Sequence, residues 1–255
     1  MDKQFNQLRQ TWDYLGEHDP LWAILSFPQK RGNRWKLEEF FATGRDEIEA
    51  LLQVVANRFP DVPHRCALDF GCGVGRLTRA LAAHFDHVIG IDVAASMIRQ
   101  ARELNAEIQA CKFVLNERAD LSFVPSGSVD FIYSNIVLQH IERPYSDRYL
   151  QEFVRVLSPR GLAVFQIPYQ YGGRYEFLAR RIPSPLLELY RRIRYERWRY
   201  QMHAIPTEQV HTIVHEAGGR VIQSEESDIA GDQWKSKLYF VRTVPGVYVR
   251  GSTSK

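Results

Sequence analysis

Three glycines at alternate positions, Gly71, Gly73 and Gly75, follow an apolar run and stand just before a helical pattern. Glycine lets the backbone turn tightly and lets a ligand approach closely. The free N–H groups at the start of the next helix point toward such a ligand. A second apolar run ends in Asp92, 21 residues after Gly71 and near the roughly 20 typical of an acid that binds a ribose diol. These residues indicate a nucleoside ligand at the carboxyl edge of parallel strands.

The glycine spacing argues against a dinucleotide as the ligand. Dinucleotide folds favour G-x-G-x-x-G, with a pyrophosphate over the helix, whereas this chain has G-x-G-x-G preceded by Asp69. A carboxylate at the tip of the first strand repels a diphosphate at close range and suits a cationic ligand.

The run from Asp69 to Gly75 resembles the first motif of the class I S-adenosylmethionine-dependent methyltransferases. The resemblance continues through Asp92 and the segments 116–123, 127–135 and 157–162, and covers residues 64–168 best. It implies an enzyme with S-adenosylmethionine as cofactor. The acceptor it implies is the oxygen or nitrogen of a small molecule, a sugar or a lipid-linked intermediate, because the Pro-Pro-aromatic and Pro-Cys motifs of nucleobase enzymes are missing after strand four.

The resemblance also assigns roles at the donor end of the site. It implies that Gly71, Gly73 and Gly75 let the backbone pack against the cofactor. Asp69 is expected to orient its ammonium group, directly or through water, and Asp92 to accept both ribose hydroxyls.

Further residues are expected around the adenine and the transferred methyl group. Met97 packs on the adenine face in this interpretation, with ordinary core packing as the alternative. Asn116 or Glu117 reads the adenine amino edge, and the sequence leaves open which one. Asn135 ends strand four beside the methionine moiety. His140 lies at the mouth of the crevice as a candidate general base, because histidine titrates near neutral pH; the alternative is a histidine bonded to a loop carbonyl.

Composition sets limits on other classes of protein. The net charge is +3, too small to argue for nucleic acid by itself. Three scattered cysteines, Cys66, Cys72 and Cys111, are typical of reduced thiols and predict a cytoplasmic protein. No cluster of histidine, cysteine and acid has metal-ligand spacing. The oligomeric state has no signal in the sequence.

The pattern of strands and helices predicts an α/β fold with a doubly wound, mostly parallel, seven-stranded, Rossmann-like sheet and an antiparallel last strand. We expect a helical N-terminal cover over 1–63, a cofactor-binding core over 64–168, a helical insertion over 169–205 and a C-terminal helix with two strands over 206–250. The predicted helices include 45–59, 76–84 and 95–104, the last capped by Ser96. Strands two, four and five are predicted over 87–92, 129–134 and 162–167.

The insertion is unusually basic and aromatic. Residues 174–200 hold eight arginines against three glutamates, interleaved with aromatic and aliphatic side chains. The plain interpretation is a packed helical lid with solvated arginines. The alternative is a surface for an anionic partner, either a membrane or a phosphorylated or carboxylated acceptor.

Two other classes of function are compatible with parts of this pattern. A non-catalytic S-adenosylmethionine-binding regulatory or scaffold protein would keep the same cofactor motifs without acceptor chemistry. A nicotinamide-dependent oxidoreductase would share the fold, but Asp69 and the glycine spacing argue against it.

Overall fold

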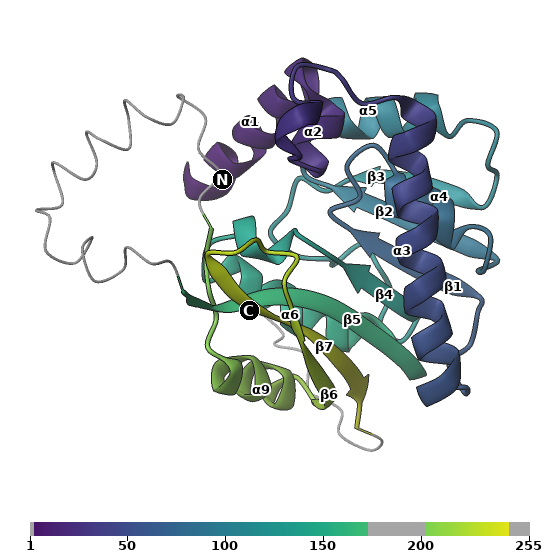
Figure 1. Ribbon diagram of the computed structural model, residues 1–255. Helices are drawn as coiled ribbons and strands as arrows, with labels where there is room; N and C mark the ends of the chain where they lie inside the picture. The colour runs from purple at the N-terminus through teal and green to yellow at the C-terminus, as the bar shows by residue number, and fades with distance from the viewer. Residues whose placement is uncertain (1–2, 173–201, 245–255) are drawn as a thin grey trace, which may run out of the picture.

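The computed structural model describes residues 3–172 and 202–244. Its centre is a seven-stranded sheet with the strand order β3-β2-β1-β4-β5-β7-β6 (Figure 1). The first five strands are parallel to one another, and β7 runs antiparallel between β5 and β6. The predicted fold class is therefore confirmed, including the antiparallel strand near the end of the chain.

The strands alternate with helices along most of the chain. The strands are β1 (Cys66–Phe70), β2 (His87–Asp92), β3 (Cys111–Leu115), β4 (Val129–Ser134), β5 (Leu157–Tyr171), β6 (Gly219–Ser227) and β7 (Trp234–Thr243). The helices are α1 (Lys3–His18), α2 (Pro20–Ile24), α3 (Leu37–Arg58), α4 (Arg76–Leu81), α5 (Ala95–Leu104), α6 (Tyr145–Val156) and α9 (Thr207–Glu216), with short 3₁₀ turns at Pro28–Lys30 and Leu138–His140.

The sheet has an apolar core on each face. On one face, Ile48 and Leu51 of α3 and Leu81 of α4 pack against Phe131 and Val164 of the sheet. On the other face, side chains of α6 and α9 pack against alternate residues of the same strands. This division follows from the period of two along each buried strand, and it places the carboxyl ends of β1, β2 and β4 along one edge.

Two elements are longer than the sequence pattern predicts. Helix α3 begins at Leu37 rather than Arg45, because Phe40 and Phe41 pack in an apolar cluster with α1 and Trp35. Strand β5 extends from Leu157 to Tyr171 because β7 pairs with it up to Trp234. Both extensions depend on partners far away in the sequence, which a local pattern does not report.

The N-terminal helices are fastened to the core through the start of α5. The Asp13 carboxylate of α1 accepts a hydrogen bond from the Ser96 backbone N–H at 2.7 Å, and the Ser96 hydroxyl donates to the Asp13 carbonyl oxygen at 2.8 Å. Ser96 makes no side-chain cap of its own helix, so that expectation was wrong. Asp13 of the cover supplies the capping oxygen instead, at the helix end that favours negative charge.

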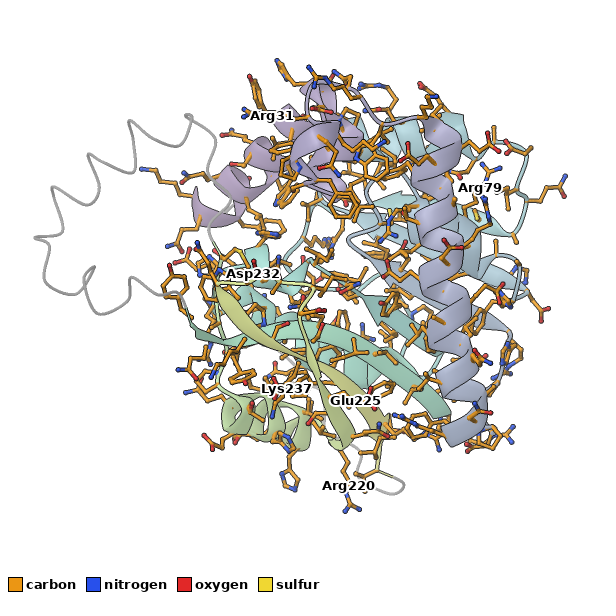
Figure 2. All side chains as sticks on the ribbon, in the orientation of Figure 1. Arg31, Arg79, Arg220, Glu225, Asp232 and Lys237 are labelled. Carbon is orange, nitrogen blue, oxygen red and sulfur yellow. The ribbon has the colours of Figure 1, made fainter. Side chains whose placement is uncertain are left out.

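The outer edge of the sheet carries charged side chains. Arg220 and Glu225 project from edge strand β6 (Figure 2), and charge on an edge strand discourages pairing with another chain. The expected basic lid at 174–200 lies outside the described residues. Among the helices that are described, none combines the length and the apolar character needed to cross a bilayer.

Candidate active site

The glycine turn after β1 adopts a backbone shape that residues with side chains avoid. Gly71, Gly73 and Gly75 have φ angles of +77°, +52° and +88°, in the left-handed region that glycine enters without a steric penalty. The backbone N–H groups of Gly71 and Cys72 both donate to the Ile91 carbonyl oxygen of β2, at 2.8 and 3.0 Å. These bonds hold the turn across the ends of β1 and β2.

Side chains from two other segments close against this turn. A Cβ atom at Gly71 would lie 2.4 Å from Val137, in the segment after β4, and one at Gly73 would lie 2.5 Å from Ile24 of α2. The turn is therefore walled by the N-terminal cover on one side and by the end of β4 on the other. Neither position therefore has room for a side chain.

Asp92 joins the turn to the next helix. One of its carboxylate oxygens accepts from the Gly73 N–H and the other from the Ala94 N–H, each at 2.9 Å. Burial raises the pKa of Asp92, and the two backbone N–H donors act against that rise. Each carboxylate oxygen has a further lone pair, so Asp92 can still accept hydrogen bonds from a ribose diol.

Asp69 does not face the same crevice. Its side chain is 1% exposed and lies between β1 and α4, where it accepts a hydrogen bond of 2.6 Å from the Thr78 hydroxyl. Burial raises its pKa to about 7, although the Thr78 hydrogen bond and Arg76 act in the opposite direction. The carboxylate is thus turned into the core beneath the turn, and its role toward a bound ammonium group stays a prediction.

Met97 is also enclosed by protein. It is 1% exposed and packs in the apolar cluster formed by the N-terminal cover, which includes Leu15, Trp35 and Phe40. The structure thus supports the alternative given for this residue, core packing, over contact with an adenine ring.

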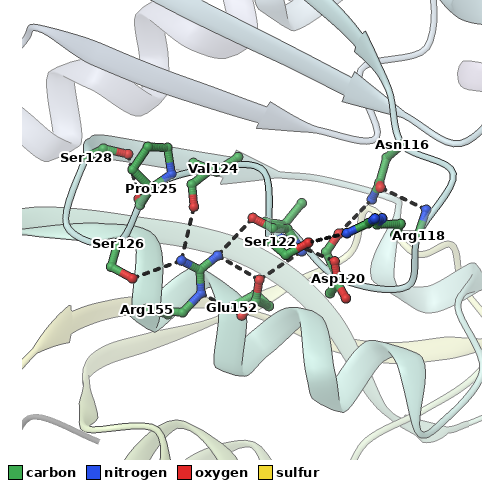
Figure 3. Close-up of polar contacts among 11 residues, drawn as sticks. Asn116, Arg118, Asp120, Ser122, Val124, Pro125, Ser126, Ser128, Glu152 and Arg155 are labelled. Carbon is green, nitrogen blue, oxygen red and sulfur yellow. Dashed lines mark hydrogen bonds and ion pairs between the residues drawn. The ribbon is translucent and has the colours of Figure 1, made fainter. Parts of the chain in front are cut away.

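Asn116 and Glu117 have different surroundings. The Asn116 amide nitrogen donates to the Asp120 carbonyl oxygen, and its amide oxygen accepts from the Arg118 N–H (Figure 3). The same nitrogen also donates to the Tyr149 hydroxyl of α6, so both amide N–H groups are used by protein atoms. The Glu117 side chain is 61% exposed and pairs with Arg9 of α1 at 2.8 Å. Of the two, Glu117 is the side chain open to a ligand.

The rest of this loop is held to α6. Arg155 donates to the carbonyl oxygens of Leu121 and Val124 and to the Ser126 hydroxyl, while Glu152 accepts from the Leu121 N–H (Figure 3). An ion pair of 2.7 Å joins Arg155 and Glu152. The segment between β3 and β4 is therefore fixed to α6. This attachment keeps the segment in place beside the crevice.

A polar network that the sequence analysis missed connects α3 to the ends of β1 and β4. One oxygen of Glu47 accepts from the Tyr133 hydroxyl at 2.9 Å and from the Asn135 amide at 2.7 Å. Its other oxygen pairs with Arg76 at 2.8 Å, and the Arg76 side chain is 4% exposed. The signal was present in the sequence, because Glu47 occupies a position on the apolar face of the helix that includes Ile48 and Leu51.

Backbone strain follows directly after Asn135. Ile136 has a φ of +61°, a conformation that costs a β-branched residue free energy and persists only where surrounding contacts enforce it. The strain lies between Asn135 and Val137, the two residues that line the end of β4. Strain of this kind is typical of functional sites.

Three histidines, His140, His203 and His211, lie in different places. His140 contacts the Trp12 ring edge to face, with 5.2 Å between ring centroids, and its Nε2 lies 3.1 Å from the Gln139 amide nitrogen. The His203 N–H donates to the Gln139 carbonyl oxygen, so the chain returns from the insertion near His140. His211 is on α9 beside Tyr239. This helix covers the face of the sheet opposite to α3. The described residues hold no group of three potential metal ligands.

Comparison with solved structures identifies the class of fold. A Leishmania major S-adenosylmethionine-dependent methyltransferase has a TM-score of 0.65 at 14% identity, covering 93% of this chain and 82% of that one. Magnesium protoporphyrin IX methyltransferase from Synechocystis, solved with S-adenosylhomocysteine, has a TM-score of 0.61 at 15% identity, covering 95% of this chain and all of that one. The fold is therefore that of the class I methyltransferases.

The sequence comparison finds similarity to methyltransferases. Residues 67–161 match the family described as "Methyltransferase domain". A trans-aconitate 2-methyltransferase of Azoarcus sp. is 29% identical over 154 residues, which is 59% of this chain and 57% of the relative. A 2-methyl-6-phytyl-1,4-hydroquinone methyltransferase of Synechocystis is 33% identical over 103 residues, 40% of this chain and 31% of the relative.

These matches are partial in length. The chain spans about half the length of the curated relatives that it matches first, 57% and 41%. Both segments that carry the predicted nucleoside site, the glycine turn and the end of β4, lie within the matched residues 67–161.

Proposed function

We propose that this protein is an S-adenosylmethionine-dependent methyltransferase that acts on the oxygen or nitrogen of a small molecule. The observation that carries the proposal is the positive-φ glycine turn held by Asp92 and Ile91, at the same edge of the sheet as Asn135. The match of residues 67–161 to methyltransferase domains supports it, as do the methyltransferase names of the relatives.

The described residues fit this cofactor in separate ways. Gly71 and Gly73 bring backbone without side chains to the ligand, Asp92 accepts from the ribose hydroxyls, and Glu117 is the exposed polar group near the base. When bound, the cofactor supplies a sulfonium methyl group. Transfer of that group would form a bond from the acceptor's lone pair to carbon and would leave the electron pair of the broken carbon–sulfur bond on sulfur.

The chain's own contribution is mainly alignment. Holding the acceptor atom in line with the methyl group is worth several kcal/mol in this type of displacement, and α1, α2 and α3 exclude water from the reacting centre. The acceptor loses one proton overall. His140 is the titratable group that we assign to receive it, because it lies six residues after the end of β4.

The test is transfer of a labelled methyl group from S-adenosylmethionine to a small-molecule extract. The proposal predicts labelled product with the intact protein and loss of most labelling in Asp92→Ala. Cofactor binding without labelling of any fraction would favour a non-catalytic binding protein, and absence of cofactor binding would refute the proposal.

A further inference from the structure

Two buried amide side chains, one directly after β4 and one within β5, carry unsatisfied polar atoms. Gln166 is 0% exposed, and neither its Oε1 nor its Nε2 has a hydrogen-bond partner among the described residues; the same holds for Oδ1 of Asn135, which is 9% exposed. An unsatisfied buried polar group is costly, so native proteins keep few of them. Such atoms are candidates for contact with a bound molecule.

The strand register places these two amides side by side. Ser134 of β4 pairs with Phe165 of β5 in parallel register, so the next residues, Asn135 and Gln166, lie at the same level. They also share a face of the sheet. Gln166 lies two residues beyond Val164, which packs on the α3 face, and Asn135 bonds to Glu47 of α3 on that face.

Glu47 determines which Asn135 atom is available. The Asn135 amide nitrogen donates to Glu47 at 2.7 Å, so its oxygen is the atom left for a ligand. The charge of Glu47 is matched by Arg76 at 2.8 Å. Asn135 therefore offers an acceptor and Gln166 offers both a donor and an acceptor, and both side chains are buried.

We infer that Asn135 and Gln166 hold the reacting group of the methyl acceptor, and that this group is an uncharged hydroxyl or amine. The inference rests on the proposed function. A hydroxyl donates to the Asn135 oxygen, accepts from the Gln166 nitrogen with one lone pair and keeps the other for the methyl carbon. A neutral amine donates to the Asn135 and Gln166 oxygens and keeps its single lone pair for the methyl carbon. A carboxylate only accepts hydrogen bonds, so it would face the Asn135 oxygen without a proton and would lie near the Glu47 carboxylate. The site therefore favours formation of methyl ethers or N-methyl amines over methyl esters.

The chemical class of product gives the first test. The intact protein is incubated with methyl-labelled S-adenosylmethionine and a small-molecule extract, and separately with trans-aconitate as a carboxylate acceptor. Alkali releases labelled methanol from methyl esters and leaves ethers and N-methyl groups intact. We expect alkali-stable label from the extract and little label on trans-aconitate. Mostly alkali-labile label would overturn the inference and leave the proposed function standing.

A variant tests the residues themselves. Gln166→Met keeps the side-chain volume and removes the polar atoms. We expect the rate of labelling to fall about 10- to 100-fold, the loss of one or two good hydrogen bonds, with unchanged affinity for S-adenosylmethionine and an unfolding temperature that does not fall. The unfolding temperature separates a role in acceptor binding from a role in the fold. If Gln166 only supported the fold, its replacement would lower the unfolding temperature.

Ser146→Ala is the matched control. The Ser146 hydroxyl is likewise buried without a hydrogen-bond partner among the described residues, but it lies on α6. Its removal should leave labelling unchanged. Equal labelling by wild type and Gln166→Met would overturn the inference. A wild-type protein that neither binds S-adenosylmethionine nor labels any fraction would instead refute the proposed function.

Discussion

Replacing Asp69 with asparagine should change how the stability of the protein depends on pH. Burial raises the pKa of Asp69 to about 7, against roughly 3.9 for an unfolded chain. Between these values the folded protein keeps a proton on Asp69 that the unfolded chain has lost. The free energy of unfolding therefore falls as pH rises, by about 1.4 kcal/mol per pH unit from this group alone. The effect levels off above about pH 7.

Asp69→Asn removes this dependence and keeps an oxygen for the Thr78 hydroxyl. Urea unfolding of both proteins without ligand, at pH 5, 6, 7 and 8, isolates the contribution as a difference. We expect the variant to gain about 3 kcal/mol relative to wild type between pH 5 and pH 7, with little further change at pH 8. If the difference in free energy of unfolding between the variant and wild type does not change with pH, Asp69 is ionised in the folded protein and its burial has been misjudged.

Three further substitutions test the contacts around the site. Glu47→Gln should lower the free energy of unfolding by at least about 2 kcal/mol, because Arg76 stays buried without its counter-charge; in denaturant titrations, Arg76→Met in the same chain should recover part of the loss. Asp13→Ala should cost about 1 kcal/mol, measured in the same way, through loss of the cap on α5. Asp130→Asn should make the free energy of unfolding depend less on pH in the acid range. Burial acts to raise the pKa of Asp130, but hydrogen bonds from Arg65 and Ser158 hold it below its usual value. Its stabilisation is therefore present above about pH 4 and is lost as pH falls further.

The parts of the fold that a local pattern can specify were predicted well. Strands β2 and β4 and helix α5 have the predicted bounds, because each is an apolar run or stripe bordered by turn residues. The glycine turn was also located correctly, because three glycines at alternate positions after an apolar run are typical of such a turn. These features depend on residues close together in the sequence.

The features that sequence reasoning missed depend on distant partners. Asp69 looks like a ligand contact because it ends a strand beside glycines, yet its orientation is determined by Thr78 on the next helix. Glu47 lies on the apolar face of its helix, but its partners Asn135, Tyr133 and Arg76 are brought to it only by the fold. Gln166 is one polar residue in a buried strand, and only the register with β4 places it beside Asn135.

Calorimetric titration of the intact protein with S-adenosylmethionine tests the central claim most directly. The account predicts a dissociation constant in the micromolar range, about −8 kcal/mol, for both S-adenosylmethionine and S-adenosylhomocysteine. Asp92→Ala, checked for folding by its unfolding temperature, should bind at least tenfold more weakly, because each ribose hydrogen bond to the carboxylate is worth about 1.5–3 kcal/mol. Unchanged affinity in a folded Asp92→Ala variant, or heat of binding with a nicotinamide dinucleotide in place of S-adenosylmethionine, would contradict the account.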